Sequence, residues 1–289
     1  MTDPGTPSRE AMPSGSRRSR LLGGSDRGSR GVLVSVISTV LFLVLVGFII
    51  VNAPGWQEFQ SFFLDPEVFA SSWPKIVRAF WINVQMFLVA EVFVLIFGLL
   101  LALMRSLPGP VFTPIRGFAI VYVDVMRGLP AILVVYVLGF GMPGLGIEGM
   151  PTDEFFWGTL SLVLLYSAYV SEVYRAGINS IHPSQEAAAR SLGLSRFGAL
   201  RYVVVPQAVR RVIPPLLNDF IGLQKDTALV GLLGLVEAFR RADIEAAAAF
   251  NFTPYVVTAL LFLALTIPLS RFVDWLVSRD QRRQLAGAR

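Results

Sequence analysis

Charged side chains stand within apolar stretches of this chain, and their spacing indicates what chemistry they could do. A charge near the middle of a membrane helix costs roughly 2.5–3.5 kcal/mol on insertion scales, so each one needs a partner or a function. Asp124 and Arg127 are three residues apart, as are Glu172 and Arg175, so each acid can pair with a base on its own helix. Glu91 has no such partner, and it must face another helix or a water-filled path.

A second polar patch interrupts the apolar stretch 214–235. Asp219 and Asp226 are seven residues apart and therefore share one helix face, with Lys225 before Asp226 and Thr227 after it. Such groups either neutralise one another inside a helix bundle or bind a charged solute. The spacing alone leaves both interpretations open.

The composition indicates a membrane protein and excludes several kinds of site. The chain has 289 residues, 54% of them hydrophobic, and a mean hydropathy of +0.62, which is too apolar for a soluble domain of this length. It has no cysteine and a single histidine, His182, which excludes disulfides and both thiolate and histidine-cluster metal sites. A membrane-embedded enzyme would therefore lack a catalytic constellation. The net charge of +5 comes from loop arginines and does not indicate nucleic-acid binding.

Six stretches are long and apolar enough to cross a membrane as helices, so we expect an all-α membrane protein. They are residues 32–52, 81–104, 117–140, 156–178, 214–235 and 254–277. The fifth qualifies only if its three charged residues face the protein interior. The first is too long for the apolar part of a signal peptide, and Pro54 spoils a cleavage site after it, so we expect it to be retained.

The loop charges predict the orientation of the chain. With the N-terminus in the cytoplasm, the inner segments carry most of the arginines. The outer segments then carry only Lys75, Arg78, Arg240 and Arg241. We therefore predict a multi-pass protein with both termini in the cytoplasm.

The same stretches divide the chain into parts. Residues 1–31 are poor in large apolar groups, and we expect a disordered cytoplasmic tail. Residues 32–52 form an additional N-terminal span, and the aromatic-rich segment 53–80 is expected at the outer membrane surface. Residues 81–279 form the main transmembrane domain, and 280–289 a basic cytoplasmic tail.

The polar segment 183–206 lies between two spans on the predicted inner side and reads EAAARSLGLSRFGALRYVVVP from Glu186 onward. Ser184 can cap a helix that starts at Gln185, and Gly193 can take the left-handed conformation that ends it. Ser195 can then cap a second short helix that runs toward Pro206.

The first of these helices exposes a strip of small side chains, Ala187, Ala188 and Ala189. Small residues let a partner approach closely, so the strip suits docking into a cleft on another protein. The alternative is an amphipathic helix that rests on lipid headgroups.

The spacing of Glu186-Ala187-Ala188, Gly193 and Pro206 resembles the EAA loop of the permease subunits of ABC importers. RGLP at 127–130, AYVSEVYRAGINSI at 168–181 and VPQAVRRVIPPLLNDFIGLQKDTAL at 205–229 resemble the polar-amino-acid branch of that family. The resemblance covers roughly residues 78–283. Ala228 departs from the family, in which KDTSL is more frequent.

The resemblance implies a five-helix permease core in a bacterial cytoplasmic membrane, preceded here by an extra span. It implies a second permease chain, homologous or identical, two copies of an ATPase subunit and an extracytoplasmic amino-acid-binding protein. ATP would be bound by the ATPase and no cofactor by this chain, which has no G-x-x-x-x-G-K-[ST] stretch. The contact with the ATPase would be made by Glu186, Ala187, Ala188 and Gly193.

An amino-acid substrate needs an acceptor for its ammonium group and donors for its carboxylate. Glu91 or Glu172 could be the acceptor, and Lys225, Arg127 or the backbone N–H groups near Gly222 could be the donors. The candidate pathway residues are Glu91, Arg127, Glu172, Lys225, Asp226 and Thr227. We favour glutamate or glutamine because of the resemblance. Another small polar solute is an alternative, as is a channel or a membrane scaffold, although these last two leave the EAA loop without a role.

Overall fold

The computed structural model describes residues 29–287, so most of the predicted tail 1–31 lies outside the described residues. Helices joined by turns make up this part of the chain, which contains no strand. Long apolar helices without strands confirm the all-α membrane fold. The chain divides into two compact units, residues 1–59 and 60–289, which we describe separately.

The first unit contains the helix α1 (Ser29–Val51) and the beginning of α2 (Trp56–Phe63). The segment Gly31–Val51 is long and apolar enough to cross a membrane, and none of its most apolar window is buried within the protein. An apolar helix with exposed side chains is suited to contact with lipid or with another chain. The additional N-terminal span is therefore present as a helix.

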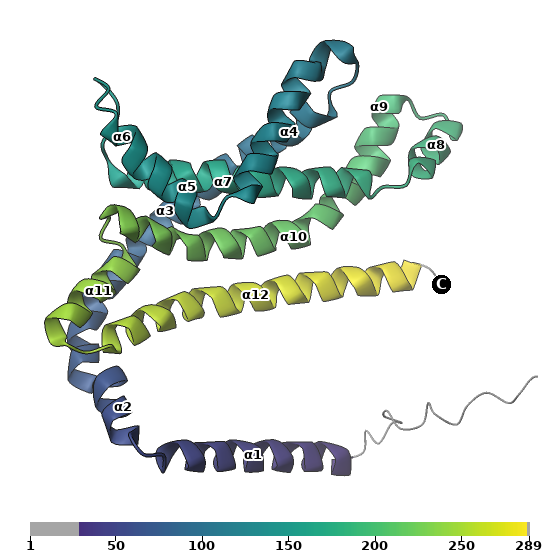
Figure 1. The fold of residues 1–289 in the computed structure, drawn as a ribbon. Coiled ribbons are helices and arrows are strands. Elements are labelled where there is room, and N and C mark those ends of the chain that lie inside the picture. Colours follow the sequence, from purple (N-terminus) through teal and green to yellow (C-terminus); the bar gives the residue numbers. More distant parts are fainter. Residues whose placement is uncertain (1–28, 288–289) are drawn as a thin grey trace, which may run out of the picture. The chain divides into compact units, whose positions relative to one another are not determined.

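The second unit is built from one long helix and the shorter helices that pack on it (Figure 1). Its main helices are α3 (Pro66–Ser106), α4 (Thr113–Gly128), α5 (Ala131–Tyr136), α7 (Glu154–Asn179), α8 (Pro183–Ser191), α9 (Arg196–Ala199), α10 (Val205–Asp226), α11 (Ala238–Ala249) and α12 (Thr253–Gly287). Short connecting elements are the 3-10 helices η2 (Pro110–Phe112) and η5 (Thr227–Leu233), the π-helical turns η3 (Val137–Gly141) and η4 (Leu200–Val204), and α6 (Met142–Gly144).

Helix α3 begins at Pro66, well before the stretch 81–104 that the sequence predicts as a span. Asp65 caps this helix by accepting hydrogen bonds from the N–H groups of Glu67 and Val68, and Pro66 occupies the first helical position, where a missing N–H costs nothing. Residues 66–80 of the predicted surface segment 53–80 are therefore the beginning of a continuous 41-residue helix.

The predicted span 117–140 is broken. Helix α4 ends at Gly128, α5 begins at Ala131, and the two pieces meet at an angle of 109°. Pro130 explains the break, because a proline disfavours a helical conformation in the residue before it, and Leu129 is extended at φ −94° and ψ 141°. The straight span expected there is therefore wrong, although the two pieces together are apolar enough for one bent crossing.

Helix α10 and the following η5 occupy the predicted span 214–235. The described residues include four helices that are long and apolar enough to cross a membrane, or five with the bent pair, and α10 is not among them. Its charged residues explain this, and α10 packs against α7 and α12 (Figure 1) with Lys225 left exposed. The remaining predicted spans, 32–52, 81–104, 156–178 and 254–277, coincide with apolar helices.

The core of the second unit lies between α3 and α7. Met86 and Val94 of α3 pack with Leu162 and Leu165 of α7, all of them almost fully buried. Gly98 lets the two helices approach so closely that a Cβ there would stand 2.6 Å from a methyl carbon of Val170. This pair of helices is the scaffold on which the polar residues of α7 and α10 are placed.

A smaller cluster joins the other half of α3 to α11 and α12. It contains Ile76, Ala238, Ala242 and Val257, each with 0% of its surface exposed. In the predicted orientation this end of the unit faces the outside of the cell.

Candidate functional site

The segment 183–206 forms two short helices joined by a tight turn. Helix α8 begins at Pro183, and its cap is His182, whose Nδ1 accepts a hydrogen bond from the Ser184 N–H at 3.2 Å. The predicted start at Gln185 with a Ser184 cap is therefore wrong, because the helix begins earlier in the chain. Proline at the first helical position and an acceptor just before it make a well-defined helix start.

The turn after α8 has the predicted geometry. Gly193 has φ +90°, a left-handed conformation, and Ser195 Oγ accepts a hydrogen bond from the Gly198 N–H at 3.1 Å to cap α9. Glu186 Oε1 of α8 lies 3.8 Å from Arg196 Nε of α9. The cap and the glycine set the geometry of the turn between the two helices, and the exposed ion pair contributes little to it.

The exposed face of this turn differs from the predicted strip of three alanines. Ala187 and Ala188 are exposed, but Ala189 is 5% exposed and packs inside the protein. Leu192 and Phe197 flank Gly193 and are 86% and 74% exposed. The sequence contained a signal for Leu192 and Phe197, since both are large apolar residues in a polar loop. The interpretation of the sequence missed this signal.

The second short helix does not end at Pro206. Helix α9 continues through the π-helical turn η4 into α10 without a loop, and Pro206 lies directly after the π turn within this continuous helix. The turn at Gly193 is thereby joined by one continuous helical path to Lys225 near the end of α10.

Glu172 of α7 is the centre of an ion-pair cluster. Its carboxylate accepts hydrogen bonds from Arg105 of α3 and from Arg175 of α7, the second at 2.7 Å, and Arg127 Nη1 of α4 lies 3.8 Å away. The predicted Glu172–Arg175 pair is therefore confirmed. Asp124 forms no ion pair within the described residues, so Arg127 pairs with Glu172 instead of its predicted partner.

Glu91 lies beside another acid and not beside Lys225. Asp219 of α10 is close enough for its charge to act on Glu91, and Arg127 in turn acts on Asp219. No ion pair joins Glu91 to Lys225 in the part of the chain that the structure describes. The Asp219 Oδ2 atom is buried without a hydrogen-bond partner. These four residues form a charge row that joins four helices: Glu172 of α7, Arg127 of α4, Asp219 of α10 and Glu91 of α3.

The residues around Lys225 are each held by a different helix. Asp226 accepts a hydrogen bond from the Tyr166 hydroxyl of α7 at 2.8 Å. Gln224 Oε1 accepts one from the Thr266 hydroxyl of α12 at 3.0 Å. Thr227 is completely buried, so it cannot contact a solute as predicted, whereas Lys225 is exposed. Lys225 is therefore the most exposed member of the predicted Lys225-Asp226-Thr227 patch.

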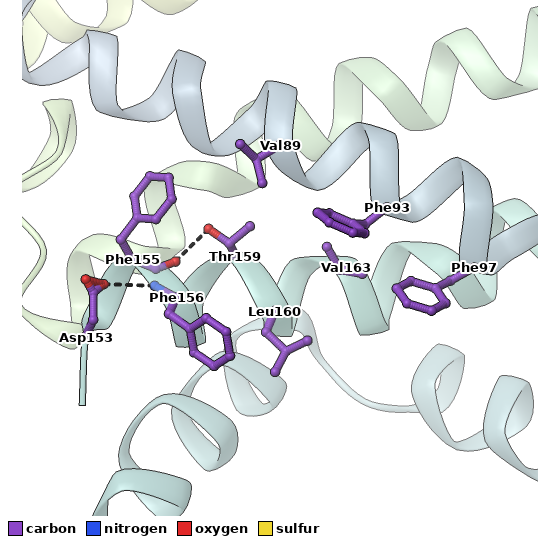
Figure 2. Close-up of a pocket in the computed structure, with 9 residues that line it drawn as sticks. All are labelled: Val89, Phe93, Phe97, Asp153, Phe155, Phe156, Thr159, Leu160 and Val163. Carbon is purple, nitrogen blue, oxygen red and sulfur yellow. Dashed lines mark hydrogen bonds between the residues drawn. The ribbon is translucent and has the colours of Figure 1, made fainter. Parts of the chain in front are cut away.

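Two pockets of the second unit are lined by different kinds of side chain. Figure 2 shows a groove of about 330 Å³ between α3 and α7, where Phe93 and Phe97 lie opposite Val163. Its polar groups already bond locally, since Asp153 accepts from the Phe156 N–H and Thr159 donates to the Phe155 carbonyl. This groove suits an apolar occupant and not an amino acid.

Another pocket, of about 380 Å³, lies between α7 and α10 and is lined by an acid and a base. Glu172 and Arg211 line it, and the Arg211 guanidinium donates to the Ser180 carbonyl oxygen. Within residues 29–287, no group of three or more His, Asp or Glu side chains could hold a metal ion.

Glu237 caps α11 on the predicted outer side. Its carboxylate is completely buried and accepts hydrogen bonds from the N–H groups of Phe239 and Arg240 and from Asn83. Burial raises the pKa of Glu237, and these three hydrogen bonds oppose that rise.

Comparisons with known proteins point to one family. Residues 94–281 match the family described as binding-protein-dependent transport system inner membrane component. A probable glutamine ABC transporter permease protein, GlnM of Bacillus subtilis, is 36% identical over 188 residues, 65% of this chain and 84% of the relative. The glutamate transport system permease protein GluC of Corynebacterium glutamicum is 33% identical and covers 68% of this chain and 90% of its own. The arginine transport system permease protein ArtQ of Bacillus subtilis is also 33% identical, and the match covers 71% of this chain and 92% of that relative.

Solved structures share the fold. The crystal structure of an amino acid ABC transporter with histidines has 31% sequence identity and a TM-score of 0.65, over 71% of this chain and 94% of that chain. An inward-facing structure of the MetNI methionine ABC transporter has 17% identity and a TM-score of 0.56, and the match covers 71% of this chain and 95% of that chain. At this identity it supports the fold alone.

Proposed function

Because this chain belongs to the family of binding-protein-dependent transport system inner membrane components, we propose that it is the permease subunit of an ATP-driven importer of polar amino acids. It supplies the helices of the translocation pathway in a bacterial cytoplasmic membrane, and a separate ATPase subunit hydrolyses ATP. The partners are two copies of that ATPase, a second permease chain and an extracytoplasmic amino-acid-binding protein.

The observation that carries this proposal is the continuous helical path from the exposed turn at Gly193 to Lys225. A pump needs its ATPase to move groups that hold the solute. Ala187, Ala188, Leu192 and Phe197 form a surface for docking, with Glu186 tied to Arg196 behind it. Closure of the ATPase would push α8 and α9, and η4 would pass that push to α10.

The charges along the pathway fit a zwitterion. Glu91 and Asp219 can accept hydrogen bonds from an ammonium group, while the exposed Lys225 can meet a carboxylate. Glu172 is already engaged by three arginines, which makes it a weaker candidate for the ammonium than Glu91. Arg127, near both Glu172 and Asp219, links the two groups.

Glutamine and glutamate are our first candidates for the substrate, since relatives of this chain carry those names. The arginine permease among the relatives makes a basic amino acid the nearest alternative. The charge row contains acids and bases, so it accommodates an α-amino and an α-carboxylate group in each case.

The test is uptake by proteoliposomes that contain the permease, its ATPase and its binding protein. Radiolabelled glutamine, glutamate and arginine are supplied outside with ATP inside, and an ATPase variant that binds but does not hydrolyse ATP is the control. Accumulation above the external concentration that requires hydrolysis is expected for at least one amino acid. Equilibration without ATP would instead favour a channel, and the absence of any uptake with a functional ATPase would reject the proposal.

A further inference from the structure

We propose that Asn83 and Glu237 are positioning residues that hold Lys225 in the substrate path by fixing Thr227. The inference rests on the proposed function, because that function gives Lys225 its role. Neither Asn83 nor Glu237 touches the proposed path, since they are 2% and 0% exposed. Their contribution is made through hydrogen bonds.

The network joins four elements. The Asn83 amide of α3 donates to Thr227 Oγ1 at 3.1 Å and to Glu237 Oε2 at 2.9 Å, while its carbonyl oxygen accepts from the Ala238 N–H at 3.0 Å. Thr227 Oγ1 in turn donates to the Gln224 carbonyl oxygen at 2.8 Å, in the last turn of α10. One amide side chain therefore connects α3, the start of α11, η5 and the end of α10.

The carboxylate of Glu237 packs closely against η5. A Cβ on Gly231 would stand 2.3 Å from Glu237 Oε1, so η5 and the carboxylate are in direct contact. No cation pairs with this carboxylate in the described part of the chain, and its charge is held by the hydrogen bonds alone. A buried polar group is costly when a partner is removed, so the loss of Asn83 would force the segment to rearrange.

Thr227 marks the point where the helix changes from α to 3-10, directly after Lys225 and Asp226. The other side-chain hydrogen bonds to this turn come from different helices. The Tyr166 hydroxyl of α7 donates to Asp226, and the Thr266 hydroxyl of α12 donates to Gln224. The Asn83–Thr227 bond is the one that reaches this turn from α3. It sets the direction in which the exposed Lys225 leaves the helix.

A second contact between the same two helices provides a matched control. Lys75 Nζ of α3 lies 2.6 Å from Glu245 Oε2 of α11, and the Lys75 side chain is 51% exposed. This pair also fastens α3 to α11 but does not reach Thr227. If the Asn83 network only holds α3 against α11, then the loss of the Lys75–Glu245 pair should affect the position of residue 225 as much as the loss of Asn83.

The experiment uses the absence of native cysteines from this chain. Lys225→Cys is introduced into the complete complex in native membranes, and the rate of its modification by a water-soluble methanethiosulfonate reagent is measured. Asn83→Leu, Glu237→Gln, Thr227→Val and Lys75→Met are each added to this background. Thr227→Ser restores the hydroxyl and tests rescue.

We expect Asn83→Leu, Glu237→Gln and Thr227→Val each to change the labelling rate by about tenfold, the factor that corresponds to one lost buried hydrogen bond. Lys75→Met and Thr227→Ser should leave the rate within about twofold, as exposed ion pairs and retained hydroxyls predict. Should Asn83→Leu fail to assemble, the Thr227→Val and Thr227→Ser pair still decides the question.

Equal labelling rates in all variants would overturn the positioning role while leaving the proposed function intact. A shift with Lys75→Met as large as that with Asn83→Leu would overturn it too, because fastening of α11 would then suffice. If Lys225→Cys is not labelled even in the parent background, Lys225 does not face water, and its role in the proposed function falls together with this inference.

Discussion

Gly177 of α7 lies directly against Val212 of α10, since a Cβ on Gly177 would stand 2.0 Å from a Val212 methyl carbon. This contact brings together the two helices that carry the charge row and the continuous helical path. We predict that Gly177→Ala overpacks the contact and lowers the free energy of unfolding by roughly 1–3 kcal/mol. Thermal unfolding of the purified complex, followed by the loss of monodisperse protein, measures the change.

A smaller residue at position 212 should compensate for the methyl group that Gly177→Ala adds. Gly177→Ala combined with Val212→Ala is expected to recover most of the lost stability, because the second change makes room for the new methyl group. Gly117→Ala is the control, since Gly117 lies in α4 and a Cβ added there would have no atom within 4 Å. A double variant no more stable than Gly177→Ala alone would show that the contact does not limit the packing of α7 on α10.

The turn at Gly193 is predicted to be essential for coupling. Gly193→Val places a β-branched residue at φ +90°, at a cost of roughly 1–2 kcal/mol that the turn can avoid only by changing its shape. ATP hydrolysis that is stimulated by loaded binding protein should fall, while the complex still assembles. Gly109→Val is the matched control, since Gly109 has φ +88° in another predicted inner loop. Equal losses in both variants would indicate general strain and not a role in coupling.

The exposed apolar pair beside this turn is predicted to anchor the ATPase. Phe197→Ser and Leu192→Ser should each weaken co-purification of the ATPase by about tenfold or more, as removal of a large apolar anchor from an interface does. Ala188→Trp should have the same effect through bulk. Tyr202→Ser, which removes a ring that is 70% exposed in η4, serves as the control. Normal recovery of the ATPase with Phe197→Ser would place the docking surface elsewhere.

The ion-pair cluster is predicted to be structural. Glu172→Gln leaves Arg105, which is only 12% exposed, without its anion, and should lower stability by roughly 3–5 kcal/mol. Arg105→Met combined with Glu172→Met should recover part of the loss. Arg196→Gln is expected to be nearly neutral, because this side chain is 80% exposed and its pair with Glu186 is long. A fully stable Glu172→Gln protein with altered substrate preference would assign Glu172 to the pathway instead.

The orientation of the chain follows from its loop arginines and is tested by labelling. Ser195→Cys should react only with membrane-permeant thiol reagents in intact cells, and Thr152→Cys also with impermeant ones. The chain has no other cysteine to compete for the reagent. Reaction of Ser195→Cys with an impermeant reagent would reverse the topology and remove the docking surface from the side where ATP is available.

Local signals in the sequence were sufficient for much of this fold. Apolar length predicted the helices of the main spans, and a glycine followed by a serine cap predicted the turn at Gly193 and the start of α9. These features depend on residues close together in the chain. The Pro130 break was equally local, and its restriction on Leu129 could have been read from RGLP.

The partners of the charged residues could not be predicted in the same way. Asp124 and Glu172 each had an arginine three residues away, yet only Glu172 uses it, because Arg105 and Arg127 arrive from other helices. Thr227 appeared to be a pathway residue from its neighbours Lys225 and Asp226. Its burial depends on Asn83, far away in the sequence, and no periodicity within 214–235 could reveal that contact.

The π-helical turn η4 (Leu200–Val204) has a consequence for how this chain can tolerate insertions and deletions. A π turn contains one residue more than the α turn it replaces, so the surplus residue can be regarded as an insertion retained within a helix. Deleting one residue from η4 would restore a regular helix and keep α8 and α9 in nearly their present orientation about the axis of α10, because a π turn and an α turn each complete about one rotation. Deleting a second residue would rotate α8 and α9 by about 100° about that axis. Leu192 and Phe197 would then face another direction. This turn can therefore lose one residue without redirecting the exposed apolar pair, so related chains should differ there by at most one residue.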